Sequence, residues 1–372
     1  MADQDIQDLK LTPLDALHRE LGAKMVPFAG YAMPVHYPDG IIAEHIHTRD
    51  QASLFDVSHM GQARLRGEGA AAALETLVPG DLQGLGLGRT RYTVLTNPEG
   101  GIIDDLMVTN RGDHLFLVVN AGGKERDYGH IRDHIGDKTE LETLDGQALI
   151  ALQGPEAAAV AARFAPGAGD MPFMSAQDLD IGGIPCFVSR SGYTGEDGYE
   201  ISVAAEDAES LTQKLLDEPE VKPAGLGARD SLRLEAGLCL YGHDIDETTT
   251  PVEAGLSWVI GKRRREEGGF PGAGVILEQL KAGPARKRVG LKPDGKAPAR
   301  EHTAVEDMDG NAIGEVSSGG YGPSVEGPVA MGYVKTEFSE TDTKVNLMVR
   351  GKALPGRVVG LPFVEQRYYK TG

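Results

Sequence analysis

Hydrophobic and polar residues alternate most regularly in the second quarter of the chain, and this pattern is typical of half-buried β-strands. The turn sequence Pro98-Glu-Gly-Gly101 predicts that the first two of these strands form a hairpin. A helix is predicted after the third strand, over residues 124–135. Because short turns join antiparallel neighbours, the region is expected to be an antiparallel meander. Its strands are predicted over residues 91–97, 102–109 and 114–120.

Helical spacing of apolar residues appears first at Leu14, Leu17 and Leu21, which predicts a short helix near the start of the chain. The last 85 or so residues alternate short apolar runs with Gly and Pro, as in a small β-barrel. Together these patterns predict an α+β fold with antiparallel sheets and flanking helices. Further strands are predicted over 148–152 and 184–189, and further helices over 155–164, 206–216 and 226–236.

The composition is that of a folded protein with several domains. The 372 residues suggest two or three domains, and 40% hydrophobic with 25% charged residues excludes a disordered chain. A net charge of −19 argues against general nucleic-acid binding. Glycine, at 50 residues, reaches about twice its usual share of ~7%, which predicts many tight turns and close backbone contacts.

The charge is unevenly distributed along the chain. Residues 261–300 hold eleven Lys and Arg against four Asp and Glu, a net charge of +7, which leaves −26 for the rest. Such a shift suits a domain junction, and a solvated linker is the simplest interpretation. The alternative is that the basic run Lys262-Arg-Arg-Arg265 helps to dock an acidic partner.

Cys186 and Cys239 both lie in apolar sequence, so they are predicted to be buried thiols rather than metal or disulfide cysteines. The first eight residues are acidic and lack an apolar core, unlike a signal or transit peptide. We find no run of about 18 apolar residues that would span a membrane. These observations predict a cytoplasmic protein that is not bound to a membrane.

The common enzyme motifs are absent, among them the Walker A lysine, the Gly-x-Ser-x-Gly elbow and His-Glu-x-x-His. His36, His45, His47 and His59 match no standard metal spacing, so no metal site is predicted.

Two carboxylates, Asp104 and Asp105, interrupt an apolar strand. Successive strand residues point to opposite faces, so one acid can face water while the other must face a core or a cavity. A carboxylate in apolar surroundings is costly unless it is paired or used. We predict that Asp105 is the inward acid, and that replacing Asp104 has the milder effect. The alternative, that Asp105 only makes a structural hydrogen bond, stays open on the pattern alone.

The hairpin register identifies the neighbours of Asp105. If Asn97 pairs with Ile102, then Asp105 lies opposite Val94 and diagonal to Tyr92 on the same face. An aromatic ring beside an inward acid suits a flat, nitrogen-bearing ligand.

A second candidate site is the loop 190–200, where three glycines allow the backbone to approach a ligand closely. Its aromatic and acidic side chains can stack on a ligand or accept hydrogen bonds from it, although an acidic surface turn is the alternative. Arg229 and Arg233 could clamp carboxylates, or pair with Asp230 or Glu235 on an exposed helix. The loop side chains concerned are Tyr193, Glu196, Asp197 and Glu200.

Eight short motifs, spread over nearly the whole chain, together resemble the aminomethyltransferases, the T-proteins of the glycine cleavage system. They are Phe28-Ala-Gly-Tyr-Ala-Met-Pro34, Leu54-Phe-Asp-Val-Ser-His-Met-Gly61, Gly100-Gly-Ile-Ile-Asp-Asp-Leu106, Gln153-Gly-Pro155, Ser191-Gly-Tyr-Thr-Gly-Glu-Asp-Gly-Tyr-Glu200, Gly225-Leu-Gly-Ala-Arg-Asp230, Arg233-Leu-Glu-Ala236 and Tyr241-Gly-His-Asp-Ile-Asp-Glu247.

The resemblance implies three domains in a cloverleaf around a central folate cavity. We expect residues 1–60 with 145–245 in the first, 61–144 with 246–280 in the second, and 285–372 in a C-terminal β-rich domain. It also implies transfer of a one-carbon unit from the aminomethyl-dihydrolipoyl arm of H-protein to tetrahydrofolate, without a metal. H-protein and the polyglutamate tail of folate then become the candidate acidic partners for the basic run.

The resemblance assigns Asp105 as the catalytic acid, which orients folate and stabilises positive charge on its nitrogens. It implies that Glu200 accepts hydrogen bonds from the pterin edge, that Arg229 lies near the glutamyl side, and that Tyr368 closes over the site. The remaining positions that it implies for the folate cavity are Met60, Tyr92, Asn120 and Tyr193.

Three positions depart from the family pattern. Tyr31 stands where tryptophan is usual, Leu238 where a cavity tyrosine can occur, and residues 317–324 replace a Thr/Ser-rich motif. The alternatives are a related folate-dependent demethylase of a methylated amine or sulfonium compound, and a folate-binding protein of iron–sulfur assembly. The latter carries a Lys-Gly-Cys motif, which neither cysteine here matches.

Overall fold

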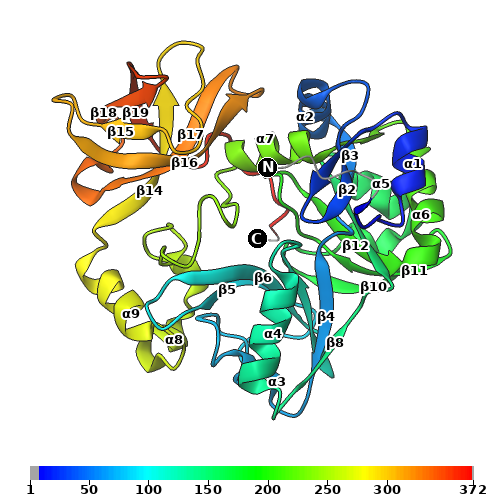
Figure 1. Cartoon of the computed structure of the whole chain (residues 1–372). Helices are drawn as coiled ribbons and strands as arrows, with labels where there is room; N and C mark the ends of the chain where they lie inside the picture. The colour runs from blue at the N-terminus through cyan, green and yellow to red at the C-terminus, as the bar shows by residue number, and fades with distance from the viewer. Residues whose placement is uncertain (1–7, 371–372) are drawn as a thin grey trace.

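The computed structural model describes residues 8–370, which form three lobes around a common centre (Figure 1). Two lobes each contain an open β-sheet covered by helices, and the third, orange and red in Figure 1, is a closed barrel. The predicted fold class, with antiparallel sheets, flanking helices and a C-terminal barrel, is confirmed. The predicted lack of a leader peptide rests on the first eight residues, of which 1–7 lie outside the described range. The domain limits stay a prediction.

The first lobe is built on a six-stranded sheet, antiparallel except for the pair β13 and β3. In spatial order its strands are β10 (Ala176–Ile181), β11 (Ile184–Ser189), β12 (Gly198–Ala204), β9 (Gln147–Gln153), β3 (Ala52–Asp56) and β13 (Val221–Pro223). Around it lie α1 (Asp15–Glu20), α2 (Ile41–Asp50), α5 (Ala157–Phe164), α6 (Ala208–Leu216), α7 (Leu226–Glu235) and the hairpin of β1 (Lys24–Phe28) and β2 (Tyr31–His36).

Strand β9 lies in the middle of this sheet, and its unbroken apolar sequence reflects burial on both faces. Ile150 and Leu152 pack with α1, α5 and α6 in one core. Leu149 and Ala151 pack with α7 in another. A strand that is covered on both sides has no polar face, so its sequence does not alternate.

The second lobe contains the predicted meander, extended by two strands that the pattern did not reveal. The spatial order is β5 (Thr90–Thr96), β6 (Ile102–Asn110), β7 (His114–Val119), β4 (Gly61–Arg66) and β8 (Glu140–Thr143). Helices α3 (Ala70–Leu74) and α4 (Lys124–Ile135) pack on it. The three predicted strands and the helix over 124–135 are therefore confirmed.

The register of the β5–β6 hairpin differs from the prediction at its end but agrees at the acid. Ile102 pairs with Thr96 rather than Asn97. A β-bulge next to this pair places one extra residue in β6, after which Val94 lies opposite Asp105, as predicted.

The third lobe is the six-stranded barrel of residues 286–359. Its strands, in order around the barrel, are β14 (Arg286–Pro293), β17 (Gly327–Lys335), β16 (Ala312–Gly322), β15 (Ala304–Glu306), β18 (Lys344–Val349) and β19 (Lys352–Val359). Its interior holds a separate cluster of apolar side chains, among them Leu291, Val316 and Leu347.

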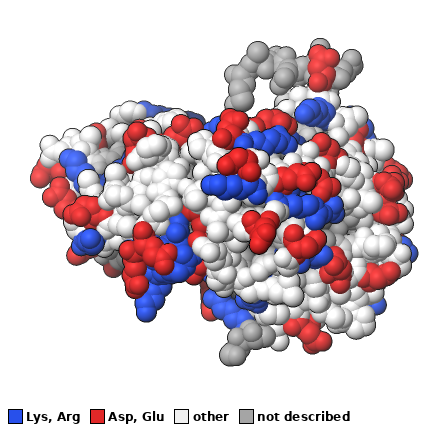
Figure 2. All heavy atoms as spheres, turned by 90° about the horizontal axis from the view of Figure 1, so that it is seen from below, with Lys and Arg blue, Asp and Glu red and all other residues white. Residues whose placement is uncertain are grey.

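The interpretation of residues 261–300 as a solvated linker is wrong. The first part forms two helices, α8 (Lys262–Glu267) and α9 (Ala273–Ala282). Arg263 pairs with Glu75 at 2.6 Å and Asp81 at 2.9 Å, and Arg264 is buried. These two arginines fasten α8 to the second lobe, whereas Lys262 and Arg265 are exposed, so a role of the run in docking stays a prediction. On the face seen in Figure 2, basic and acidic side chains are interspersed.

A buried ion network joins the first lobe, the barrel and the C-terminal tail. Arg49 on α2 donates to Glu196 Oε1 at 2.8 Å and Glu235 Oε2 at 3.1 Å, and both carboxylates are buried. Arg367 of the tail donates to the other Glu196 oxygen at 2.7 Å. The backbone N–H of Ser324, between β16 and β17, donates to Glu235 Oε1 at 2.8 Å. Although burial opposes it, the hydrogen bond and charge of His45, the hydrogen bond from Ser324 and the charge of Arg49 lower the pKa of Glu235 to about 2.

Both cysteines are buried and free, as predicted. Within residues 8–370, we find no helix that is both long and apolar enough to cross a membrane.

We expect Arg49→Met to lower the thermal denaturation midpoint strongly, because it leaves the buried Glu235 without its arginine and Glu196 with Arg367 alone, at a cost of about 3–5 kcal/mol. Adding Glu196→Gln and Glu235→Gln should recover part of the loss. The control is Lys222→Met, which breaks an exposed pair with Asp39. Equal midpoints for Arg49→Met and the control would contradict the role of the network.

Candidate active site

Asp105 lies on β6, and its carboxylate shares one amide with Asp104. Asn120, directly after β7, donates from Nδ2 to Asp105 Oδ1 and to Asp104 Oδ1, each at 2.7 Å. The backbone N–H of Asp105 donates to Asp104 Oδ1 at 2.9 Å. Asp104 is fully buried and Asp105 half-buried, so the expectation that Asp104 can face water is wrong. The Arg126 side chain of α4 bonds to the Asp104 carboxylate at 3.2 Å.

The surroundings of Asp105 favour its protonated form. Burial and the Asp104 carboxylate raise the pKa of Asp105 to about 7, although hydrogen bonds from Asn120 and Tyr92 act to lower it. Burial and the Asp105 carboxylate in turn raise the pKa of Tyr92 far above its usual range, so Tyr92 remains a hydrogen-bond donor. An acid that titrates near neutral pH can hold or release a proton during a reaction.

Trp258, in the short helix η4 (Ser257–Val259), extends this aromatic surface and was missed in the sequence. Its ring stacks on Tyr92 with centroids 5.5 Å apart and planes at 29°, yet the side chain is 60% exposed. A large aromatic residue that is exposed near a half-buried acid suits stacking on a flat ligand. The signal in the sequence was that Trp258 is the only tryptophan of the chain.

Tyr193 and Arg229 approach the same centre from the first lobe. The Arg229 guanidinium lies 4.8 Å from the centre of the Tyr193 ring, and the Tyr193 hydroxyl donates to the backbone carbonyl of Cys239. Asp105 lies close enough to Tyr193 to raise its pKa, although burial is the main cause. Arg229 Nη1 is buried and has no hydrogen-bond partner within residues 8–370. Such a donor indicates where an acceptor of a ligand would bind.

Glu200 completes the group on β12. Its Oε2 accepts a hydrogen bond from Ser191 Oγ at 2.8 Å, and its carboxylate acts electrostatically on Arg229. Six predicted site residues are therefore brought together around the centre of the molecule: Tyr92, Asp105, Asn120, Tyr193, Glu200 and Arg229.

Met60 and Tyr368 have other neighbours. Met60 packs against the apolar cluster of α7 that includes Ala228. The ring of Tyr368 stacks on Phe173, with centroids 4.2 Å apart, and lies near the Arg49 network. Its contact with a ligand stays a prediction.

Other candidate residues of the sequence are structural. Glu196 pairs with Arg49, and Asp197 with Arg190, which corrects both the ligand-binding and the surface-turn interpretations. Arg233 is buried and bonds to Asp230 and Asp244. The loop glycines pack against protein, since a Cβ on Gly192 would lie 1.9 Å from Gln153 Oε1. Ion pairs within the protein therefore hold Glu196, Asp197 and Arg190 of this loop, and sequence patterns do not reveal such pairs.

At one departure from the family pattern the structure offers a compensating contact. Tyr31 accepts a hydrogen bond from Lys124 Nζ at 2.7 Å through its hydroxyl, which an indole could not do. The histidines are used within the fold: His45 bonds to Glu235, and burial lowers the pKa of His59 to about 4. The described part of the chain holds no group of three or more His, Cys, Asp or Glu side chains suited to a metal ion.

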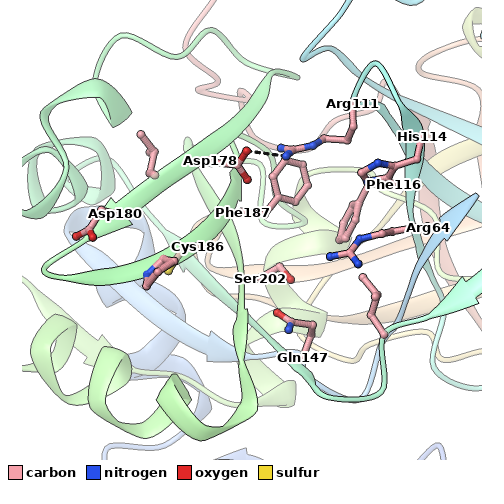
Figure 3. Close-up of a pocket in the computed structure, with 13 residues that line it drawn as sticks. Arg64, Arg111, His114, Phe116, Gln147, Asp178, Asp180, Cys186, Phe187 and Ser202 are labelled. Carbon is pink, nitrogen blue, oxygen red and sulfur yellow. Dashed lines mark hydrogen bonds and ion pairs between the residues drawn. The ribbon is translucent and has the colours of Figure 1, made fainter. Parts of the chain in front are cut away.

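A cavity of about 470 Å³ lies elsewhere, between strands of the first and second lobes (Figure 3). Its most prominent charges are paired, since Arg111 bonds to Asp178 at 2.6 Å and stacks on Phe187. The predicted site residues are not among those that line it, so we do not assign it to the site.

Comparison with known proteins agrees with the fold. Residues 14–264 match the family model of the GCVT N-terminal domain, and residues 286–365 match that of the glycine cleavage T-protein C-terminal barrel domain. The chain is 48% identical to a mitochondrial aminomethyltransferase of Dictyostelium discoideum, over 98% of this chain and 94% of the relative. It is 47% identical to that of Pisum sativum, over 98% and 91%.

A solved structure is similar over the same length. The crystal structure of the glycine cleavage system aminomethyltransferase T from Bartonella henselae matches with a TM-score of 0.91 and 45% identity, covering 97% of this chain and 100% of that one.

The comparison contradicts the prediction of a cytoplasmic location, because the curated relatives are named as mitochondrial proteins. The acidic start of the chain was a poor basis for that prediction. The matches in sequence and structure show that the chain belongs to the aminomethyltransferases, the T-protein family of the glycine cleavage system.

Proposed function

We propose that the chain takes the one-carbon unit from an aminomethyl group on the dihydrolipoyl arm of H-protein and transfers it to tetrahydrofolate. The methylene carbon loses its bonds to sulfur and to the amine nitrogen and gains two bonds to folate nitrogens. The two protons of those nitrogens leave on the thiol and the ammonia. The products are 5,10-methylenetetrahydrofolate, ammonia and dihydrolipoyl H-protein.

The observation that carries this proposal is the placement of Asp105. Its carboxylate is held by Asn120 on one side and faces Tyr92 on another, at a pKa near neutrality. In its ionised form it stabilises positive charge that develops on a nitrogen beside it, and in its protonated form it can return a proton. Because Asn120 and Tyr92 hold the group in place, little reorganisation is needed during the reaction.

The residues around Asp105 suit folate. Tetrahydrofolate supplies the two nitrogens that accept the carbon. The exposed Trp258 and Tyr92 offer a stacked surface for a flat ring, and Glu200 offers an acceptor for ring N–H groups. The unpartnered Nη1 of Arg229 offers a donor for a carboxylate. These side chains thus offer partners for the flat ring of folate, for its N–H groups and for a carboxylate.

The proposal is tested with aminomethylated H-protein, by following folate-dependent release of ammonia. We expect Asp105→Asn to lower kcat about 100-fold or more, since the amide cannot carry the charge. For the native chain, kcat should fall as the pH decreases through about 7, because Asp105 then gains a proton. The control is Asp133→Asn, on the exposed side of α4. Folate binding without any folate-dependent release of ammonia would overturn the proposal.

Binding of folate should also be visible in the fluorescence of the chain. Trp258 is the only tryptophan and stacks on Tyr92, so we expect a saturable change of its emission when tetrahydrofolate is added. Tyr92→Leu should weaken the apparent affinity, and Trp258→Phe provides the correction for absorption by folate. A native chain that turns over without a saturable change would contradict a folate site beside Trp258.

A further inference from the structure

A second buried carboxyl group lies behind Asp104. Asp127, on α4, is fully buried, and neither of its oxygens has a hydrogen-bond donor within residues 8–370. Its carboxyl group lies close to that of Asp104, because the Arg126 side chain contacts both and a Cβ on Gly123 would contact both. Two buried carboxylates that lie close together repel when both are ionised, so this arrangement favours a state in which one of the two carries a proton.

One guanidinium bridges the two acids. Arg126 Nη2 donates to Asp104 Oδ2 at 3.2 Å, and Arg126 Nε lies 3.6 Å from Asp127 Oδ1. The same side chain is 42% exposed and also contacts Glu247 at 3.3 Å. A single, partly solvated positive charge that is shared with a third carboxylate does not balance two buried negative charges. This balance of charge favours a pair with one proton.

The chain keeps the space beside both carboxyl groups clear. A Cβ on Gly123 would lie 2.0 Å from Asp104 Oδ2 and 3.2 Å from Asp127 Oδ2. A Cβ on the adjacent Gly122 would meet nothing within 4 Å. Gly123 is therefore the residue that lets the loop before α4 close over the two acids.

We infer that Asp104 and Asp127 share one proton, and that this acid pair, bridged by Arg126, sets the charge that Asp105 experiences across Asn120. The inference deepens the proposed function and rests on it for the role of Asp105. The pair touches no substrate, so its members are positioning residues. Asp104 keeps the negative charge because Asn120, Arg126 and a backbone N–H all donate to it. Burial and that charge raise the pKa of Asp127 to about 8, so Asp127 holds the proton.

Groups other than the acid pair also affect the electrostatic environment of Asp105. The groups that face Asp105 or the pair from the surrounding elements are Tyr92 on β5, Asn120 after β7, Tyr193 in the loop before β12, Arg126 on α4, and Cys239, Tyr241 and Glu247 in the segment after α7. The Tyr92, Tyr193 and Cys239 groups all have pKa values raised by burial, so they are neutral near pH 7. Among the close neighbours of Asp105, Asp104 therefore carries the negative charge.

The shared proton can be detected without any enzyme assay. In the Asp105→Asn chain at pH 7, labelled with ¹³C-aspartate, we expect the infrared band of a protonated, buried carboxyl group, shifted by the label. Adding Asp127→Asn should remove this band, since its amide donates to Asp104 in place of the acid. Adding Asp133→Asn should leave it. A missing band in Asp105→Asn, or a band that survives Asp127→Asn, would overturn the inference and leave the proposed function untouched.

The influence on Asp105 is measured by the pH profile of kcat. Asp104→Asn removes the neighbouring charge, so the acid limb of the profile should move to lower pH by about one unit. A limb that stays at the native position would overturn the coupling, whatever the loss of kcat.

A second pair of variants tests the geometry of the acid pair without replacing an aspartate, in case the aspartate variants do not fold. Gly123→Ala, which drives a methyl group into the Asp104 carboxylate, should lower kcat about tenfold or more, whereas Gly122→Ala should not. Equal effects of the two glycine changes would speak against a role for the geometry of the pair.

Discussion

The buried pairing of Arg49 with Glu196 and Glu235 is the interaction on which the arrangement of the lobes depends. Glu235 ends α7, and Glu196 lies in the loop before β12. The barrel and the C-terminal tail bond to the same two carboxylates. Ionised groups without water are stable only when their hydrogen bonds are complete, so each element must keep its position for the others to hold theirs. That mutual dependence fixes α7 at the centre of the molecule.

With α7 fixed, its arginines take different parts. Arg233 is satisfied by Asp230 and Asp244 and serves the fold. Arg229, one turn earlier, points at Tyr193 and keeps a buried donor unpartnered. The second lobe brings Asp105 to the same region on a central strand of its meander. The centre thus combines an incompletely bonded cation with an acid of raised pKa, a state that folding alone would not favour and that a ligand can stabilise.

The meander, the α4 helix and the position of Asp105 opposite Val94 could be predicted, because local alternation and a short turn determine them. The sequence did not predict strands β4 and β8 or the helices of residues 262–282. These elements pair or pack with parts of the chain that are distant in sequence. The same limit explains the error at Asp104. Alternation along a strand tells which side an acid faces, but only the packing of α4 shows that this side is covered.

The sequence by itself determined the family, the antiparallel meander with its barrel, and six of the residues gathered around Asp105, because these depend on residue types in local order; Trp258 was not among them. Only the tertiary structure decided which charged groups are consumed by pairing and which remain available. Glu196, Asp197 and Arg263 are paired within the fold, whereas Arg229 Nη1 has no partner among the described residues and Trp258 stays exposed. The raised pKa values of Asp105 and Asp127 also arise there, because a pKa is set by burial and by charges that the fold brings near.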